Sequence, residues 1–383
     1  IDKYFKALTR FGIKPGLTRI QALLSYLGDP HDRLTNVHIA GTNGKGSVAA
    51  IISQVLIEEG YRVGVFTSPH LRSYKERIRV NQESISDDDL WLLIKEIEPA
   101  ILECQRAGHG NPTEFETLTA LAFLYFARQE VDVAVVETGM GGTYDSTNVV
   151  NPLVTAITNV GVDHLKYLGP GLQDVARNKA GIMKPGVPLI YGDHDPVVLK
   201  ILSENSDQLG SSLVLAEQTA KITRVINRGW EGFVLDFSTP EWIAEGVNFS
   251  LPGSFQLKNL ATALSILSQM QQRGYKISQE TLYTSLPRIR WSGRLERIHR
   301  DPDVILDAAH NLHGVHSLAE ALAEIYPEQK AVLVIGILDD KDSLGMLQRL
   351  EEFTRICIVT RPEGERGRNW LEIFRQATRV FPE

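Results

Sequence analysis

The chain carries the run Gly41-Thr42-Asn43-Gly44-Lys45-Gly46-Ser47 between a short apolar segment, residues 37–40, and a helix-like segment, residues 48–59. A strand, a glycine-rich turn and a helix in this order expose backbone N–H groups that can surround a phosphate. Lys45 adds a mobile positive charge, and the Ser47 hydroxyl can reach Mg²⁺. The run therefore indicates a site for a nucleoside triphosphate.

The run departs from the strict P-loop pattern at two positions. Ile39 stands where the pattern requires its first glycine, and Gly46 separates Lys45 from Ser47. A plain glycine turn between a strand and a helix is the alternative, because short motifs often match by chance. The rest of the chain has to decide between these interpretations.

The composition is that of a globular protein with sizeable cores. The chain has 383 residues, 43% hydrophobic content and a formal net charge of -7, which suggests two domains and argues against a general nucleic-acid binder. Cys104 and Cys357 lie too far apart for a disulfide framework or a metal-binding spacing, and we expect a reducing cytoplasm. No apolar run approaches the ~20 residues of a membrane span.

Short apolar runs alternate with longer helical patterns in the first half of the chain. The expected strands are residues 61–66, 131–136, 154–157 and 187–191. The expected helices include residues 115–129 and 172–183. This alternation predicts an α/β fold of the P-loop type, with a mostly parallel sheet flanked by helices and with the strands' carboxyl ends along one edge.

A change of pattern after residue 212 predicts a small antiparallel excursion, a hairpin of residues 222–227 and 232–237, followed by a helix at 257–273. A second alternation then begins near Trp291, with strands at 304–306, 331–335 and 356–359 and helices at 316–325 and 344–353. Pro287 interrupts a helix just before it. We therefore expect an ATP-binding domain, 1–289, and a smaller Rossmann-like α/β domain, 290–383.

Several polar residues follow the predicted strands. Glu137 ends one strand and could bind Mg²⁺, which takes one or two carboxylates together with phosphates; the alternative is a solvated strand-end acid. His164 could bind a metal or touch phosphate, or be an ordinary loop histidine. Lys179 could simply complement a helix dipole. Asp307 and His310 could reach a nucleotide, or belong to a loop that ends at a helix-capping Asn311.

In this order, these segments resemble the folylpolyglutamate synthase/dihydrofolate synthase family, a branch of the Mur ligase superfamily. The resemblance runs from about residue 11 to about residue 360. The motifs that carry it are His38-Ile39-Ala40-Gly41-Thr42-Asn43-Gly44-Lys45-Gly46-Ser47, Phe66-Thr67-Ser68-Pro69-His70-Leu71, Glu76-Arg77-Ile78-Arg79-Val80-Asn81, Thr113-Glu114-Phe115-Glu116, Asp145-Ser146-Thr147-Asn148, Lys179-Ala180-Gly181-Ile182, Gly293-Arg294-Leu295-Glu296 and Asp307-Ala308-Ala309-His310-Asn311. Gly46 fits, because the family's loop reads Gly-Thr-Asn-Gly-Lys-Gly-Ser/Thr.

The resemblance implies an ATP-dependent amide ligase. ATP would phosphorylate the carboxylate of a reduced folate or of dihydropteroate, and the amino group of L-glutamate would attack the acyl phosphate. The expected catalytic residues are Lys45, Lys179 and His164. Ser47 and Glu137 would hold one Mg²⁺ and His164 a second, and Lys179 matches the family lysine that CO₂ carbamylates.

The resemblance also implies binding residues. Those expected at the nucleotide are Thr42, Asn43, Gly44, Lys45, Gly46, Ser47, Asn259, Arg294, Asp307 and His310, with Asp307 and His310 also near the glutamate site. Those expected at the pterin-side substrate are Ser68, Pro69, His70, Thr113, Phe115 and Asp145. Phe115 could stack on a planar pterin, and Asp145 could accept hydrogen bonds from its amino-pyrimidine edge.

Two departures from the family pattern lie near these sites. Thr143-Tyr144 replaces an Arg-Leu pair, and Ala308 replaces a glycine. The alternatives are a Mur ligase acting on a peptidoglycan precursor and a nucleotide-binding module without ligase activity. The resemblance implies a monomer, and the composition argues against nucleic acid and membrane as partners.

Overall fold

A computed structural model describes residues 1–12, 14–362 and 364–382. The chain forms two compact units, which are described separately. Unit 1 comprises Ile1–Val225, Leu235–Asn248 and Lys258–Ile289, and unit 2 comprises Ile226–Val234, Phe249–Leu257 and Arg290–Glu383. Two short segments that precede residue 290 thus belong to unit 2, and the predicted functional division into 1–289 and 290–383 stays a prediction.

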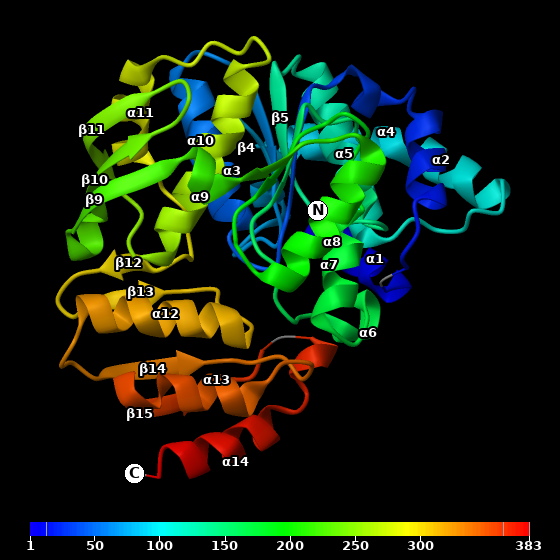
Figure 1. Cartoon of the computed structure of the whole chain (residues 1–383). Coiled ribbons are helices and arrows are strands. Elements are labelled where there is room, and N and C mark those ends of the chain that lie inside the picture. The colour runs from blue at the N-terminus through cyan, green and yellow to red at the C-terminus, as the bar shows by residue number, and fades with distance from the viewer. Residues whose placement is uncertain (13, 363, 383) are drawn as a thin grey trace. The chain divides into compact units, whose positions relative to one another are not determined.

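Unit 1 is built on an eight-stranded sheet (Figure 1). In sheet order, its strands are β4 (Glu83–Ser84), β3 (Ile78–Val80), β2 (Val63–Phe66), β5 (Val133–Glu137), β1 (Asn36–Ala40), β6 (Val154–Ile157), β7 (Leu189–Tyr191) and β8 (Leu213–Leu215). Neighbouring strands from β2 through β8 are parallel, whereas β3 is antiparallel to both β2 and β4. The predicted mostly parallel α/β sheet is confirmed.

Helices cover both faces of this sheet. They are α1 (Asp2–Leu8), α2 (Thr18–Tyr26), α3 (Lys45–Glu58), α4 (Asp87–Arg106), α5 (Glu114–Arg128), α6 (Leu165–Leu168), α7 (Leu172–Ala180), α8 (Pro196–Leu209), α9 (Ala216–Thr219), α10 (Phe255–Gln271) and α11 (Gln279–Ser285). In Figure 1, α3 and α10 lie on one side of the sheet, and α5, α7 and α8 lie on the other. Every residue of β1 and β5 is buried, as two-sided coverage of a parallel sheet requires.

The apolar side chains of the strands divide between clusters. Phe66, Ala134 and Val136 belong to a core that includes residues of α2, α4 and α5. Ile157 and Tyr191 belong to a second core with residues of α7 and α8. Because the parallel strands end at loops along the carboxyl edge of the sheet, the two cores together fix the positions from which those loops start.

The predicted hairpin is part of a three-stranded sheet with the order β11-β10-β9. The strands are β9 (Lys221–Asn227), β10 (Phe233–Ser238) and β11 (Ile243–Phe249). Sequence analysis did not predict β11. Gly246, at a φ of 65°, lies in the middle of this strand, where glycine weakens a strand pattern.

Unit 2 contains two small sheets. β12 (Glu296–His299) pairs antiparallel with β13 (Val304–Leu306), and β14 (Ala331–Ile335) pairs parallel with β15 (Thr354–Val359). Its helices are α12 (Leu312–Ile325), α13 (Ser343–Leu350) and α14 (Trp370–Val380). Leu347, Ile373 and neighbouring side chains form a core beneath β14 and β15. These sheets and helices confirm the predicted smaller α/β domain.

We predict that Gly64→Ala destabilises unit 1 through a clash between two elements. A Cβ at Gly64, in β2, would lie 2.8 Å from Cγ of Phe126 in α5, and that ring is fully buried. Overpacking of this kind costs about 1–3 kcal/mol. Urea unfolding measures the cost, and the same change in a Phe126→Leu background should cost less. Equal costs in both backgrounds would show that the ring is not the obstacle.

Candidate active site

The glycine-rich run forms the turn between β1 and α3, which begins at Lys45. Gly41 has a φ of 154° and Gly44 a φ of 84°. A Cβ at Gly41 would lie 1.9 Å from Thr158 Oγ1, and one at Gly44 would lie 2.3 Å from Asn259 Oδ1. Both positions therefore require glycine, and the turn keeps the close approach of its backbone to neighbouring residues that a side chain at either position would prevent.

Hydrogen bonds join this turn to the loop that follows β6. Thr42 N–H donates to the Asn159 carbonyl oxygen at 3.0 Å, and Asn43 N–H donates to Asn159 Oδ1 at 3.0 Å. Thr42 Oγ1 also accepts from Gly161 N–H at 2.8 Å, and Thr158 Oγ1 donates to the Asn43 carbonyl at 2.5 Å. Thr42 and Asn43 were expected to bind nucleotide, which stays a prediction; the structure shows that the Thr42 side chain and the backbone of both residues hold the turn in shape.

Lys45 folds back over its own turn. Its Nζ donates to the carbonyl oxygens of Gly41 at 3.1 Å and Thr42 at 3.3 Å. It also lies 3.7 Å from Oε1 of Glu137, the buried last residue of β5. The structure thus brings the expected phosphate-binding lysine and the expected metal-binding carboxylate together at the carboxyl edge of the sheet.

The residues present suit Mg²⁺ better than a metal that prefers an all-protein cage. Ser47 is buried in the first turn of α3, and Glu137 is buried at the strand end. Within the described part of the chain, no group of three His, Cys, Asp or Glu side chains is placed to hold a metal ion. Mg²⁺ needs only one or two carboxylates when phosphates and water complete its shell.

Lys179 lies in the last turn of α7 and is almost completely buried. Its Nζ donates to the Gly41 carbonyl oxygen at 2.8 Å, which places it directly behind the phosphate turn. Burial and the nearby charge of Lys45 lower the pKa of Lys179 to about 7, against the raising influence of Asp163 and Asp145. A large fraction of this amine is therefore neutral and nucleophilic at neutral pH.

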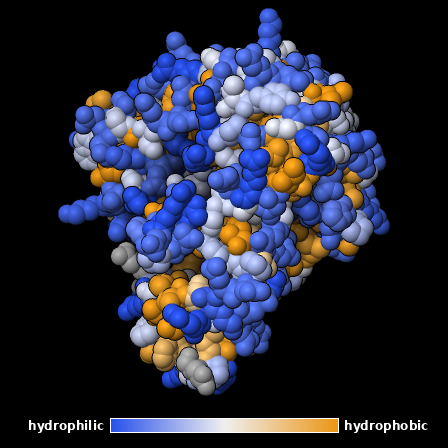
Figure 2. All heavy atoms as spheres, turned by 90° about the vertical axis from the view of Figure 1, so that its left-hand side faces the viewer, coloured by the Kyte–Doolittle hydropathy of each residue, from blue (hydrophilic) through white to orange (hydrophobic). Residues whose placement is uncertain are grey.

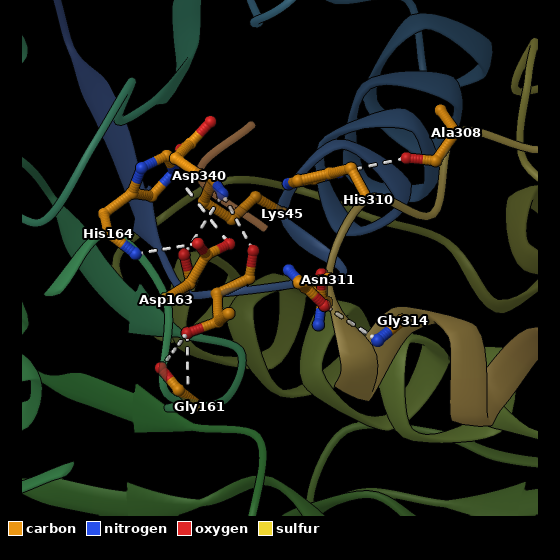
Figure 3. A network of polar contacts seen from close by, with 12 residues as sticks. Lys45, Gly161, Asp163, His164, Ala308, His310, Asn311, Gly314 and Asp340 are labelled. Carbon is orange, nitrogen blue, oxygen red and sulfur yellow. Dashed lines mark hydrogen bonds and ion pairs between the residues drawn. The ribbon is translucent and has the colours of Figure 1, made fainter. Parts of the chain in front are cut away.

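His164 lies in the loop after Gly161, next to Asp163 (Figure 3). It adopts a φ of 53° at the start of α6, and its backbone N–H donates to Asp163 Oδ1 at 2.7 Å. The imidazole Nε2 is 3.9 Å from Asp163 Oδ2. This side chain is partly exposed, so it can reach a ligand, and its predicted metal role stays a prediction.

The loop from β2 to β3 contains the expected substrate residues Ser68, Pro69 and His70. Ser68 N–H donates to Glu137 Oε2 at 3.4 Å, so the loop begins beside the carboxylate. Farther on, the Glu76 carboxylate accepts the backbone N–H groups of Leu71, Arg72 and Ser73 at 2.7–2.9 Å. This acid gives the loop a fixed shape.

Two of the expected pterin-side residues have internal partners. Thr113 caps α5 in a capping box with Glu116: its backbone N–H donates to Glu116 Oε2 at 2.7 Å, and its Oγ1 accepts from Glu116 N–H at 3.3 Å. The buried Asp145 carboxylate accepts from Met140 N–H, Thr147 N–H and Thr147 Oγ1 at 2.5–3.0 Å. Their predicted substrate contacts remain predictions.

Phe115, two residues after Thr113, is only half-buried. Its ring lies 5.7 Å from the ring of Phe66, and a Cβ at Gly139 would lie 2.5 Å from its Cζ. The ring is therefore held between β2 and the loop after β5, where a partly exposed edge or face can meet a planar substrate.

Arg294, Asp307 and His310 belong to unit 2. The Asp307 carboxylate accepts from the backbone N–H groups of Leu295 at 2.8 Å and Ala309 at 2.7 Å, and burial raises its pKa. His310 Nδ1 is 3.0 Å from the Ala308 carbonyl oxygen, and Asn311 caps α12 by accepting from Gly314 N–H at 2.8 Å (Figure 3). The capping interpretation of Asn311 is confirmed.

Sequence analysis missed several residues that shape this site. Asn178 accepts Gly142 N–H at its Oδ1, and its carbonyl accepts Thr143 N–H at 2.8 Å, which fixes the loop after β5 beside Lys179. Arg77 was quoted only as part of a motif, yet its guanidinium lies 3.8 Å from Glu114 and hydrogen-bonds to His70. The available signal was a charged residue directly before a short strand that begins with a buried isoleucine, Ile78.

No helix among residues 1–12, 14–362 and 364–382 is both long and apolar enough to cross a membrane. The face in Figure 2 is mostly hydrophilic, with separate apolar patches.

Comparison with known proteins identifies the parts of the chain. Residues 39–267 match the Mur ligase middle domain, and residues 293–382 match the glutamate ligase domain of Mur ligases. The dihydrofolate synthase/folylpolyglutamate synthase of Bacillus subtilis is 38% identical over 346 residues, which are 89% of this chain and 80% of that protein.

Solved structures agree with this match. A Mycobacterium tuberculosis folylpolyglutamate synthase complexed with ADP and AMPPCP has a TM-score of 0.91 and 33% identity, covering 99% of this chain and 86% of that one. A complex of a folylpolyglutamate synthase (FPGS) with AMPPCP and folate has a TM-score of 0.88 and 31% identity. The match covers 99% of this chain and 94% of that one. The chain therefore belongs to the folylpolyglutamate synthase and dihydrofolate synthase family of Mur ligases.

Proposed function

We propose that the protein uses ATP to activate the carboxylate of a reduced folate or of dihydropteroate and joins that carboxylate to the amino group of L-glutamate. As a member of its family, the chain is an ATP-dependent ligase. The observation that carries the proposal is the meeting of Lys45, Glu137 and Lys179 around the Gly41–Ser47 turn, at the edge where the loop of Ser68 also begins.

This arrangement suits phosphoryl transfer without a covalent enzyme intermediate. Such a reaction requires positioning and neutralisation of charge more than a protein nucleophile. The backbone N–H groups of the turn and the Lys45 ammonium supply positive charge to the β- and γ-phosphates. Ser47 and Glu137 would hold Mg²⁺, which when bound neutralises phosphate charge. His164 would contribute to a second metal site.

The bond changes balance without any further reactant. A carboxylate oxygen of the acceptor forms a bond to the γ-phosphorus while the bond from that phosphorus to ADP breaks. The glutamate amine then attacks the acyl carbon, loses a proton and expels inorganic phosphate, leaving an amide. Because an acyl phosphate hydrolyses in water, the ordered loops beside Glu137 would serve to exclude water.

Lys179 would act as a carbamate. A neutral amine attacks CO₂ and releases a proton, which turns a buried cation into an anion. The pKa of about 7 supplies the neutral amine, and an anion at this position would no longer repel Lys45. It would be placed to support the second metal site, as the family resemblance implies.

The acceptor is proposed from two relationships. The Bacillus subtilis relative carries both activities in its name, and one similar structure contains folate.

We further propose that Asn259, Arg294, Asp307 and His310 contact nucleotide or glutamate. Residues 1–289 and 290–383 would be the functional domains, and the protein would be a cytoplasmic monomer. A ligase for peptidoglycan precursors and an inactive nucleotide-binding module are the alternatives that the assay must distinguish.

We predict glutamate-dependent phosphate release when the protein is given ATP, Mg²⁺ and either tetrahydrofolate or dihydropteroate. Mass spectrometry of the acceptor should show one added glutamyl residue per phosphate released. Product from a UDP-sugar peptide and from no pterin would instead identify a ligase for cell-wall precursors. ATP binding with no glutamate-dependent phosphate release would identify a binding module.

We predict that bicarbonate controls turnover through Lys179. The pKa of Lys179 is lowered, so its neutral fraction grows as the pH rises through about 7, and carbamate formation should rise with it. Enzyme depleted of CO₂ at pH 6 should lose activity and regain it at pH 8 with bicarbonate. Lys179→Ala should reduce kcat about 10- to 100-fold, as loss of a residue that supports a metal ligand does, and show no bicarbonate response.

Lys184→Met is the matched control for this measurement. Lys184 also donates to a backbone carbonyl, that of Asn148 at 3.0 Å, but it does not contact the phosphate turn through that bond. This variant should keep the bicarbonate response. Full activity of Lys179→Ala would contradict the proposed role.

A further inference from the structure

Arg77 occupies a position that its motif alone does not explain. It is the last residue of a short 3₁₀ turn, Tyr74–Arg77, and leads into β3. Thr67 N–H donates to the Arg77 carbonyl at 3.1 Å, so Arg77 lies opposite the residue that follows β2. Since β2 is the sheet neighbour of β5, which ends in Glu137, Arg77 lies at the same sheet edge as the proposed reaction site.

The contacts of Arg77 hold its guanidinium in one orientation. Nε–H donates to His70 Nδ1 at 2.8 Å, and Cζ lies 5.2 Å from the centroid of the Tyr74 ring. His70 itself lies against Tyr74, with 4.4 Å between ring centroids. Only 12% of the arginine side chain is exposed. An arginine held through Nε presents its two Nη groups as a planar fork.

That fork retains hydrogen-bonding capacity. Nη2 lies 3.8 Å from Glu114 Oε1, a distance that makes an ion pair but exceeds hydrogen-bond length. Within the described part of the chain, the hydrogen bond of the Arg77 guanidinium is made by Nε and not by the two Nη groups. An Nη pair of this kind matches the two oxygens of a carboxylate.

The surroundings of Arg77 indicate that the acceptor substrate supplies this carboxylate. His70 belongs to the loop of Ser68, and Glu114 lies between Thr113 and Phe115, so Arg77 is bordered on both sides by the segments expected to bind the acceptor. Burial lowers the pKa of Arg77, and the nearby acids Glu114, Glu137 and Glu76, together with Tyr74, raise it. An arginine stays charged in such a setting, so the guanidinium is a partly desolvated cation.

We propose that Arg77 binds a carboxylate of the acceptor substrate through its Nη fork, with His70 and Tyr74 as positioning residues for the guanidinium. This inference rests on the proposed function and names a contact within it. Two carboxylates could supply the ligand: the reacting carboxylate, present in dihydropteroate and in folates, or the additional carboxylate that the glutamyl group of a folate carries.

The test compares Arg77→Gln and Arg77→Lys with Lys75→Gln, a control from the same 3₁₀ turn whose side chain pairs with the exposed Asp87 at 2.8 Å. Binding of tetrahydrofolate, dihydropteroate and a tetrahydropterin without a carboxylate is measured by calorimetry in the absence of ATP. KM values for both acceptors, ATP and L-glutamate are measured alongside.

We expect Arg77→Gln to weaken acceptor binding about 10- to 100-fold, the loss typical of a charge-assisted bidentate contact, while the pterin without a carboxylate binds as to wild type. Arg77→Lys should recover part of the affinity, because it keeps the charge but not the fork, and it also serves if the glutamine variant does not fold. If the binding of both acceptors is weakened, the ligand of Arg77 is the reacting carboxylate. If only the binding of tetrahydrofolate is weakened, the ligand is the additional carboxylate of its glutamyl group.

Three results would overturn the inference. The first is unchanged acceptor binding in both Arg77 variants, and the second is a changed KM for L-glutamate or ATP alone. The third is equal weakening of the pterin that lacks a carboxylate, which would show a structural role. If wild type neither binds nor converts either acceptor, the proposed function itself has failed, and that outcome is seen before any variant is made.

Discussion

The hydrogen bond from Lys179 Nζ to the Gly41 carbonyl oxygen is the contact on which the site depends most. It joins the end of α7 to the turn between β1 and α3, two segments separated by 138 positions in the sequence. A buried ammonium is costly, and here the second cation, Lys45, binds the same carbonyl oxygen. Burial and the charge of Lys45 therefore favour loss of the Lys179 proton. A neutral lysine beside a phosphate turn is a reactive group.

The other loops at this edge have fixed shapes because internal side chains occupy their backbone groups. Asn159 and Thr158 hold the phosphate turn, Asn178 holds the loop after β5, and Glu76 holds the loop after β2. Each of these side chains replaces water as a partner of backbone groups. The result is a set of preorganised loops. Lys45, Glu137 and Arg77 differ from the side chains that hold these loops, because a ligand can replace their present partners or bind beside them.

Local patterns predicted the fold well. The alternation of apolar runs and helical segments predicted the parallel sheet, and the glycine run predicted the turn at α3, because these features depend on residues adjacent in sequence. Thr113 and Asp145 illustrate the limit. Both residue types bind substrates and also cap turns, and only the folded chain shows that their oxygens accept backbone N–H groups. Arg77 was missed because arginine is usually exposed, and its burial depends on Tyr74, His70 and the distant Glu114.

The central claim is that ATP activates a carboxylate of the acceptor, and transfer of isotope tests it most directly. Tetrahydrofolate or dihydropteroate labelled with ¹⁸O in its reacting carboxylate is turned over with unlabelled ATP and L-glutamate, and the released phosphate is analysed by mass spectrometry. Attack by the carboxylate on the γ-phosphorus predicts that each phosphate formed with product carries one oxygen from the carboxylate. Phosphate without that label, released in step with glutamate addition, would contradict an acyl-phosphate route.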